Sequence, residues 1–90
     1  MATTHHLKTL PEHYNAVVRG DKLAELRKND RNFNVGDCLL LKEWTESYGY
    51  TGRSASFHVI HVCDVGFIAD GYVMLSITVN TNNYGKNNLD

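Results

Sequence analysis

The stretch SASFHVIHVCDVGFIADGYVMLSITVN, residues 54–80, decides the fold class. Its two outer segments, 54–65 and 72–80, are rich in β-branched and aromatic residues, and they flank the hexapeptide GFIADG. β-Branched side chains pack well on a pleated surface, whereas glycine and aspartate mark turns. We therefore predict two long strands joined by a turn.

Three upstream segments extend this prediction to a five-stranded sheet. CLLLKEWT, residues 38–45, follows the turn signal NVGD, and its continuous apolar start predicts a strand covered on both faces. KLAELRK (22–28) is a further strand, and HHLKTL (5–10) is a weaker one. The glycine-punctuated SYGYTG, residues 47–52, is predicted to be a loop.

One helix is predicted over TLPEHYNAVVRG, residues 9–20. Thr9 is the expected N-cap, with Glu12 completing a capping box and Pro11 in the first turn. Gly20 is expected to end the helix in the left-handed backbone conformation. The helix would pack through one apolar stripe, formed by Leu10, Tyr14, Val17 and Val18.

Five strands and one early helix predict a small α+β domain over residues 1–79. Curling the sheet into a β-barrel would remove its exposed edges. The tail NTNNYGKNNLD, residues 80–90, contains five asparagines and no apolar periodicity, so we expect it to be disordered.

The composition excludes several classes of protein. A chain of 90 residues with a formal net charge of −1 is one domain without general attraction to polyanions or anionic membranes. No apolar run is long enough to span a bilayer. With only Cys38 and Cys63, and an N-terminus that does not resemble a signal peptide, we expect a reducing, cytoplasmic setting.

A charged stretch, GDKLAELRKNDRNF (20–33), holds the candidate site residues. Strand alternation places Glu25 and Arg27 on one face and Lys22 on the other. A carboxylate beside an arginine can orient the planar guanidinium toward a phosphate or a base edge. The alternative is an ordinary surface ion pair of about 0–1 kcal/mol.

The local charge of this stretch is small. From Arg19 to Arg31 there are five basic and three acidic residues, so the sum is only +2. Counter-ion release alone therefore cannot hold a nucleic acid here, and binding would require defined geometry or base stacking.

The run Gly20, Lys22, Glu25 and Arg27 matches the G-x-K-x-x-E-x-R signature of the ASCH family, relatives of the PUA domain. Residues 7–44 and the later YTGR (50–53) resemble a small branch of that family found in bacteria and their phages. The resemblance covers roughly residues 5–79.

This resemblance implies a PUA-like β-barrel with one helix after the first strand and a cleft for RNA or a modified nucleotide. The main hypothesis is accordingly an RNA- or nucleotide-binding module. Tyr48 and Tyr50 could stack on a base from their loop, whereas Trp44 and Phe33 are expected in the core. The predicted binding residues are Lys22, Glu25, Arg27, Lys28, Arg31, Tyr50 and Arg53.

A second hypothesis is a hydrolase acting on acylated cytidine in the same cleft, with Lys22 accepting or donating a proton. In that branch of the family a catalytic threonine stands where this chain has Glu25, and a carboxylate cannot replace the hydroxyl without different covalent chemistry. A neighbouring hydroxyl would have to act instead, from Thr51, Ser54 or Ser56. Binding is therefore preferred over catalysis. A third hypothesis is a protein-interaction module.

The histidines do not predict a metal site. Strand alternation separates His58 from His61 and Cys63, and His61 is expected to be partly buried. Neither the spacing nor the number of ligands fits a closed tetrahedral zinc site. We expect no metal and no cofactor.

Overall fold

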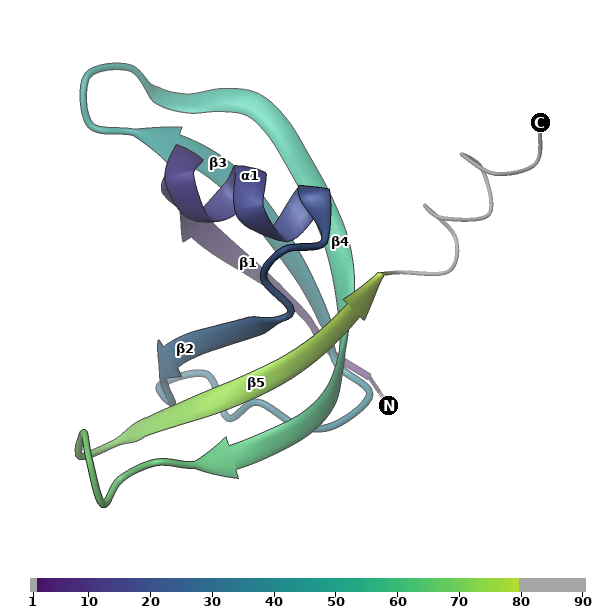
Figure 1. The fold of residues 1–90 in the computed structure, drawn as a ribbon, viewed down its shortest axis with the longest axis vertical. Coiled ribbons are helices and arrows are strands. Elements are labelled where there is room, and N and C mark those ends of the chain that lie inside the picture. Colours follow the sequence, from purple (N-terminus) through teal and green to yellow (C-terminus); the bar gives the residue numbers. More distant parts are fainter. Residues whose placement is uncertain (1, 80–90) are drawn as a thin grey trace, which may run out of the picture.

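The computed structural model describes residues 2–79 and contains five strands and one helix in that range. The predicted α+β class, with the helix after the first strand, is confirmed (Figure 1). The predicted tail, residues 80–90, lies outside the described residues. In chain order the elements are β1 (Thr4–Thr9), α1 (Pro11–Arg19), β2 (Ala24–Lys28), β3 (Cys38–Thr45), β4 (Gly49–Asp64) and β5 (Tyr72–Val79).

The strands form one sheet in the order β1-β3-β4-β5-β2. β1 and β3 are parallel, and the other neighbours are antiparallel. β4, with 16 residues, pairs first with β3 and then with β5, and its curvature bends the sheet into a half-barrel (Figure 1). β1 and β2 remain as the two edges, so the predicted closure into a barrel is not achieved by backbone pairing.

The concave face of the sheet carries the core. Its buried apolar residues alternate along the strands, as Leu39 and Leu41 do on β3. Leu40 and Trp44 lie on the other face and stay partly exposed, so the predictions that this strand is covered on both faces and that Trp44 is a core residue are wrong. The core consists of Leu7, Tyr14, Val17, Phe33, Leu39, Leu41, Phe57, Val59, Val73, Leu75 and Ile77.

Helix α1 packs through Tyr14 and Val17, whereas Leu10 and Val18 of the predicted stripe are about half exposed. Its N-cap is Leu10, without a side-chain capping bond, so the predicted capping box is wrong. Thr9 is instead the last residue of β1, buried, and its hydroxyl donates to the Leu7 carbonyl. Gly20 ends the helix at φ 85°, as predicted.

Strand β4 departs from the predicted pattern at two places. It begins at Gly49, so most of the predicted loop is strand. A bulge at Ile60 adds one residue between the pairs Val59–Ile77 and His61–Ser76 and reverses the alternation. His61 and Cys63 are consequently exposed, and the predicted partial burial of His61 is wrong.

The turn before β3 is held by a buried carboxylate. Asp37 lies 2.8 Å from Nε2 of His5 and accepts hydrogen bonds from the backbone N–H groups of Thr3 and Asn34. Burial alone would raise the pKa of Asp37, but these hydrogen bonds outweigh burial and lower it. The carboxylate therefore joins β1 to the segment that leads into β3.

Candidate functional site

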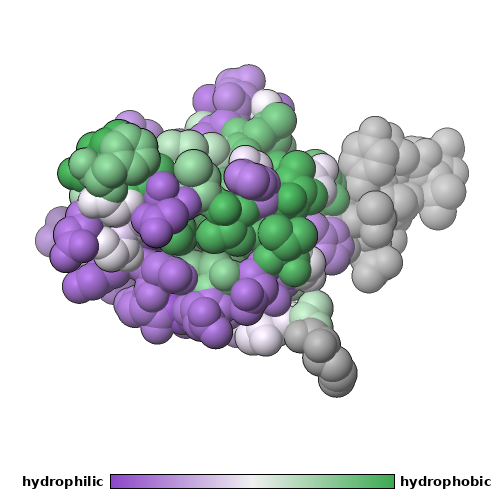
Figure 2. All heavy atoms as spheres, turned by 90° about the horizontal axis from the view of Figure 1, so that it is seen from below, coloured by the Kyte–Doolittle hydropathy of each residue, from purple (hydrophilic) through white to green (hydrophobic). Residues whose placement is uncertain are grey.

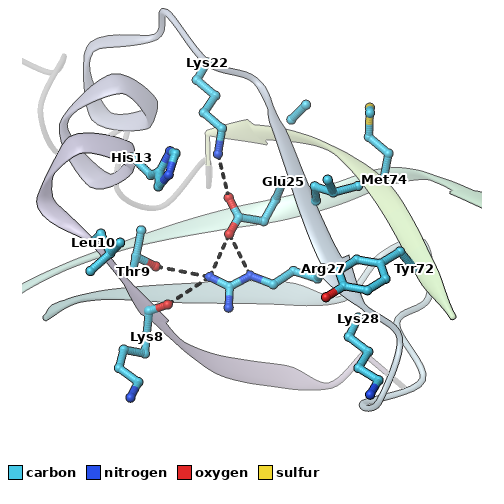
Figure 3. Close-up of a pocket in the computed structure, with 12 residues that line it drawn as sticks. Lys8, Thr9, Leu10, His13, Lys22, Glu25, Arg27, Lys28, Tyr72 and Met74 are labelled. Atoms are coloured by element: carbon cyan, nitrogen blue, oxygen red, sulfur yellow. Dashed lines mark hydrogen bonds and ion pairs between the residues drawn. The ribbon is translucent and has the colours of Figure 1, made fainter. Parts of the chain in front are cut away.

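A pocket of about 630 Å³ opens where the end of β1, the start of α1 and the edge strand β2 meet (Figure 3). This volume lies within the range of small-molecule sites. The residues that line it come from β1, α1, β2 and β5, from the junction between β1 and α1, and from the segment between α1 and β2. They are Lys8, Thr9, Leu10, His13, Lys22, Ala24, Glu25, Leu26, Arg27, Lys28, Tyr72 and Met74.

Glu25 is the centre of the polar side of the pocket. Its side chain is only 5% exposed, and its carboxylate accepts a hydrogen bond from Nζ of Lys22 at 3.2 Å. Nε and Nη2 of Arg27 both lie 2.7 Å from the other carboxylate oxygen. Two cations therefore converge on one buried acid, which fixes the positions of both (Figure 3).

Lys22 reaches Glu25 because it precedes the strand. β2 begins only at Ala24, so strand alternation does not apply to Lys22, and the prediction that it points away from Glu25 is wrong. The prediction that Glu25 and Arg27 share a face is confirmed.

Arg27 also connects the two edges of the half-barrel. Its Nη2 donates to the carbonyl of Lys8 at 3.0 Å and lies 3.5 Å from Oγ1 of Thr9, both on β1. One side chain of β2 thus bridges to β1, where the sheet lacks backbone pairing. The pocket lies at this open seam.

The other side of the pocket is apolar. Because β2 is an edge strand, residues from both of its faces border the pocket, and Leu26 pairs with Met74 of β5 on the face opposite Glu25. Leu26 and Met74 are 54% and 40% exposed. Tyr72, paired with Lys28, adds an aromatic ring to the same wall.

Positive charge predominates in the pocket. The lining residues include four cationic side chains, those of Lys8, Lys22, Arg27 and Lys28, and one carboxylate, that of Glu25, which leaves a surplus of three positive charges. The ammonium of Lys8 lies 4.2 Å from the centre of the Trp44 ring. An anion at this site would therefore be attracted even though the whole chain is nearly neutral.

The structure brings four of the seven predicted site residues together. Lys22, Glu25, Arg27 and Lys28 line the pocket. The other three do not line it: Arg31 is exposed between β2 and β3, and Tyr50 and Arg53 lie at the start of β4.

Arg53 belongs to a separate polar cluster between α1 and the sheet. It donates twice to the buried carboxylate of Glu43, at 2.9 and 3.0 Å, and once to Oδ1 of Asn15 at 2.8 Å. Thr51 donates to Glu43 at 2.8 Å. The hydrogen bonds from Arg53 and then Thr51 lower the pKa of Glu43, and the same contact raises the pKa of Arg53. This cluster anchors the helix.

The hydroxyl groups considered for catalysis do not line the pocket. Thr51 is bonded to Glu43, and Ser54 and Ser56 lie farther along β4. Thr9 does line the pocket, but its hydroxyl donates to a backbone carbonyl.

In residues 2–79 no three His, Cys, Asp or Glu side chains are grouped so that they could hold a metal ion. In the same range, no helix has the length and apolar character needed to cross a membrane.

Sequence reasoning missed eight of the pocket residues. Lys8, Thr9 and Leu10 line the pocket because the end of β1 lies beside β2 across the seam. No local sequence pattern encodes this proximity. Tyr72 and Met74 could have been found by pairing β5 with β2, since both strands were predicted. His13, Ala24 and Leu26 complete the set.

Comparison with known proteins relates the chain to a phage protein and to a protein family. An uncharacterized 12.9 kDa protein in the GpA 3' region of Escherichia phage P2 is 37% identical over 75 residues, which cover 83% of this chain and 68% of that protein. A family model described as a domain of unknown function, DUF3850, matches residues 4–77, nearly all of the described chain. The chain therefore belongs to the DUF3850 family.

Proposed function

We propose that the pocket binds RNA or a nucleotide. The observation that carries the proposal is the convergence of Lys22 and Arg27 on the buried carboxylate of Glu25, inside a pocket that also has an apolar wall. A nucleotide combines the same two features, an anionic phosphate and a flat base. The ASCH resemblance noted above is a separate argument for the same ligand class.

The phosphate contacts are assigned to Lys22, Arg27 and Lys28. Glu25 holds Lys22 and Arg27 in place before any ligand arrives, so little side-chain entropy is lost on binding. Nη1 of Arg27 makes no hydrogen bond within residues 2–79 and is available to an acceptor (Figure 3). Lys28 is exposed and completes the cationic set.

The base is assigned to the apolar wall. Stacking on an aromatic ring contributes about 1–3 kcal/mol for each base. Tyr72 is the aromatic residue that lines the pocket, so it takes the role that the sequence assigned to Tyr50. Met74 and Leu26 extend the apolar surface beside it.

We propose that the pocket binds its ligand and does not catalyse a reaction. Acyl transfer through a serine or threonine needs a hydroxyl nucleophile with an adjacent base. The only hydroxyl-bearing aliphatic side chain among the pocket residues is Thr9, which is buried and committed to the Leu7 carbonyl. No feature of the pocket favours the hydrolase hypothesis over simple binding.

The test is a fluorescence-anisotropy titration of short single-stranded RNA at several salt concentrations. The three assigned phosphate contacts predict a slope of roughly −2.1 in a plot of log K against log salt. Tyr72→Ala should weaken binding by about 1–3 kcal/mol. Lys28→Ala should weaken it and make the slope shallower. Lys42→Ala, outside the pocket, is the matched control. Equal affinities for all four proteins would refute the proposal.

A further inference from the structure

The turn between β4 and β5 exposes two large apolar side chains at its tip. Phe67 and Ile68 are 83% and 77% exposed, more than most apolar residues of this domain. Seen from below, a hydrophobic patch projects at the left of Figure 2, where Figure 1 places this turn. A hydrophobic projection of this kind indicates an interaction site.

The surroundings of this tip are acidic. Asp64 and Asp70 flank it and line a shallow hollow of about 700 Å³ together with Phe67 and Tyr72. Oδ1 of Asp64 accepts a hydrogen bond from the N–H of Gly66 at 2.7 Å, which holds the first turn of the tip. Asp70 is exposed. The tip is therefore an apolar projection with negative charge at its base.

The acidic hollow and the cationic pocket are neighbours, because Tyr72 lines both. One has an apolar projection with carboxylates, and the other has an apolar wall with a surplus of positive charge. The two are opposite in charge, each includes exposed apolar side chains, and they adjoin at Tyr72. A surface with this arrangement complements a second copy of itself when that copy is rotated by 180°.

We propose that the chain forms a twofold-symmetric dimer in which the tip of each copy enters the cationic pocket of the other. Phe67 then packs against Leu26 and Met74 of the partner, and Asp70 approaches Lys28 of the partner. Tyr72 lies near the symmetry axis. The dimer occludes the pocket and therefore competes with any ligand bound there. The inference rests on the charges and exposures above and not on the proposed function.

The first measurement is sedimentation equilibrium of the wild-type protein from micromolar to millimolar concentration at low salt. The mean mass is expected to rise from the 10.2 kDa of the monomer toward twice that value. Added salt should reduce association because the charged contacts are exposed. A mass that stays at 10.2 kDa over the whole range overturns the proposal.

The decisive measurement uses charge reversal. Loss of an exposed ion pair changes an equilibrium constant by up to about fivefold, and each contact occurs twice in the dimer, which gives about 25-fold. Asp70→Lys also places two like charges together at each contact, so it should weaken association by about 25-fold or more. Lys28→Glu should do the same. An equimolar mixture of the two variants should associate again, because each tip then meets a pocket of opposite charge.

Glu46→Lys, an exposed acid in the turn after β3, is the matched control and should associate like the wild type. Phe67→Ser should weaken association without altering charge. If the mixture of Asp70→Lys and Lys28→Glu associates no better than either variant alone, the contact is not the one proposed.

Discussion

Replacing Arg27 by alanine should destabilise the domain far more than an ordinary surface substitution. The change removes the partner that lies 2.7 Å from a carboxylate only 5% exposed. Breaking a buried ion pair costs about 3–5 kcal/mol, but here Lys22 remains as a second partner and Arg27 itself is 25% exposed. These two facts reduce the cost to about 1–2 kcal/mol. Loss of the hydrogen bond to Lys8 across the seam adds about 1 kcal/mol.

The expected loss of unfolding free energy is therefore about 2–3 kcal/mol, measured by urea denaturation at neutral pH. The m-value should stay the same, because the area exposed on unfolding hardly changes. Arg19→Ala is the matched control. Arg19 pairs with Asp21 at 2.9 Å, but both side chains are more than 60% exposed, so this loss should stay below about 1 kcal/mol.

The double variant Glu25→Leu, Arg27→Leu separates the ion pair from the seam contact. It removes the buried carboxylate of Glu25 together with its partner. If the destabilisation of Arg27→Ala comes mainly from leaving Glu25 without that partner, the double variant should be less destabilised than Arg27→Ala. If Arg27→Ala is no more destabilising than Arg19→Ala, Glu25 does not depend on Arg27 and the account of the seam is wrong.

Three further predictions concern other parts of the fold. The lowered pKa of Asp37 stabilises the folded state above the ordinary carboxyl pKa, and this contribution is lost as the pH falls through the folded value. The difference in stability between wild type and Asp37→Asn, measured by urea denaturation, should therefore be largest at neutral pH and shrink below about pH 4. Thr51→Val should raise the pKa of Glu43 toward its ordinary value in an NMR titration, because one hydrogen bond to the carboxylate is lost. Gly20→Ala should cost about 1 kcal/mol in thermal unfolding, because φ is 85° although no atom crowds a Cβ there.

Each of these three has an outcome that contradicts it. A constant difference between pH 7 and pH 3 would mean that Asp37 binds protons equally in both states. If the pKa of Glu43 is unchanged in Thr51→Val, the hydrogen bond from Thr51 does not contribute to lowering it, and Arg53 alone accounts for the lowered pKa. If Gly20→Ala is as stable as the wild type, the helix does not end in the left-handed conformation described.

Much of the fold could be predicted because local patterns match it. The β-branched segments became β4 and β5, and Gly20 stops the helix. The N-cap prediction was wrong because Thr9 belongs to β1, where burial and sheet pairing prevail over a local capping preference. The bulge at Ile60 could not be predicted, because one extra residue leaves no trace in the composition. It nevertheless moves each later side chain of β4 to the opposite face of the sheet.

Local sequence patterns also predicted part of the candidate site, since four of the seven predicted residues line the pocket. Glu25 and Arg27 are two residues apart on one strand, so their pairing follows from strand alternation. The contact of Lys22 with Glu25 could not be predicted in this way, because β2 begins only at Ala24. The contact from Arg27 to β1 depends on how far the sheet curls, which is set by the whole of β4. Arg53 was predicted to be a binding residue, whereas the structure pairs it with Glu43 on another element.

The binding claim is tested most directly by NMR chemical-shift mapping with ¹⁵N-labelled protein and a nucleoside monophosphate, followed by a short single-stranded RNA. The account predicts perturbations concentrated at residues 22–28, at Tyr72 and Met74, and at the end of β1, all saturating with one dissociation constant. Perturbations confined to the Arg53 cluster, or none at millimolar ligand, would contradict it.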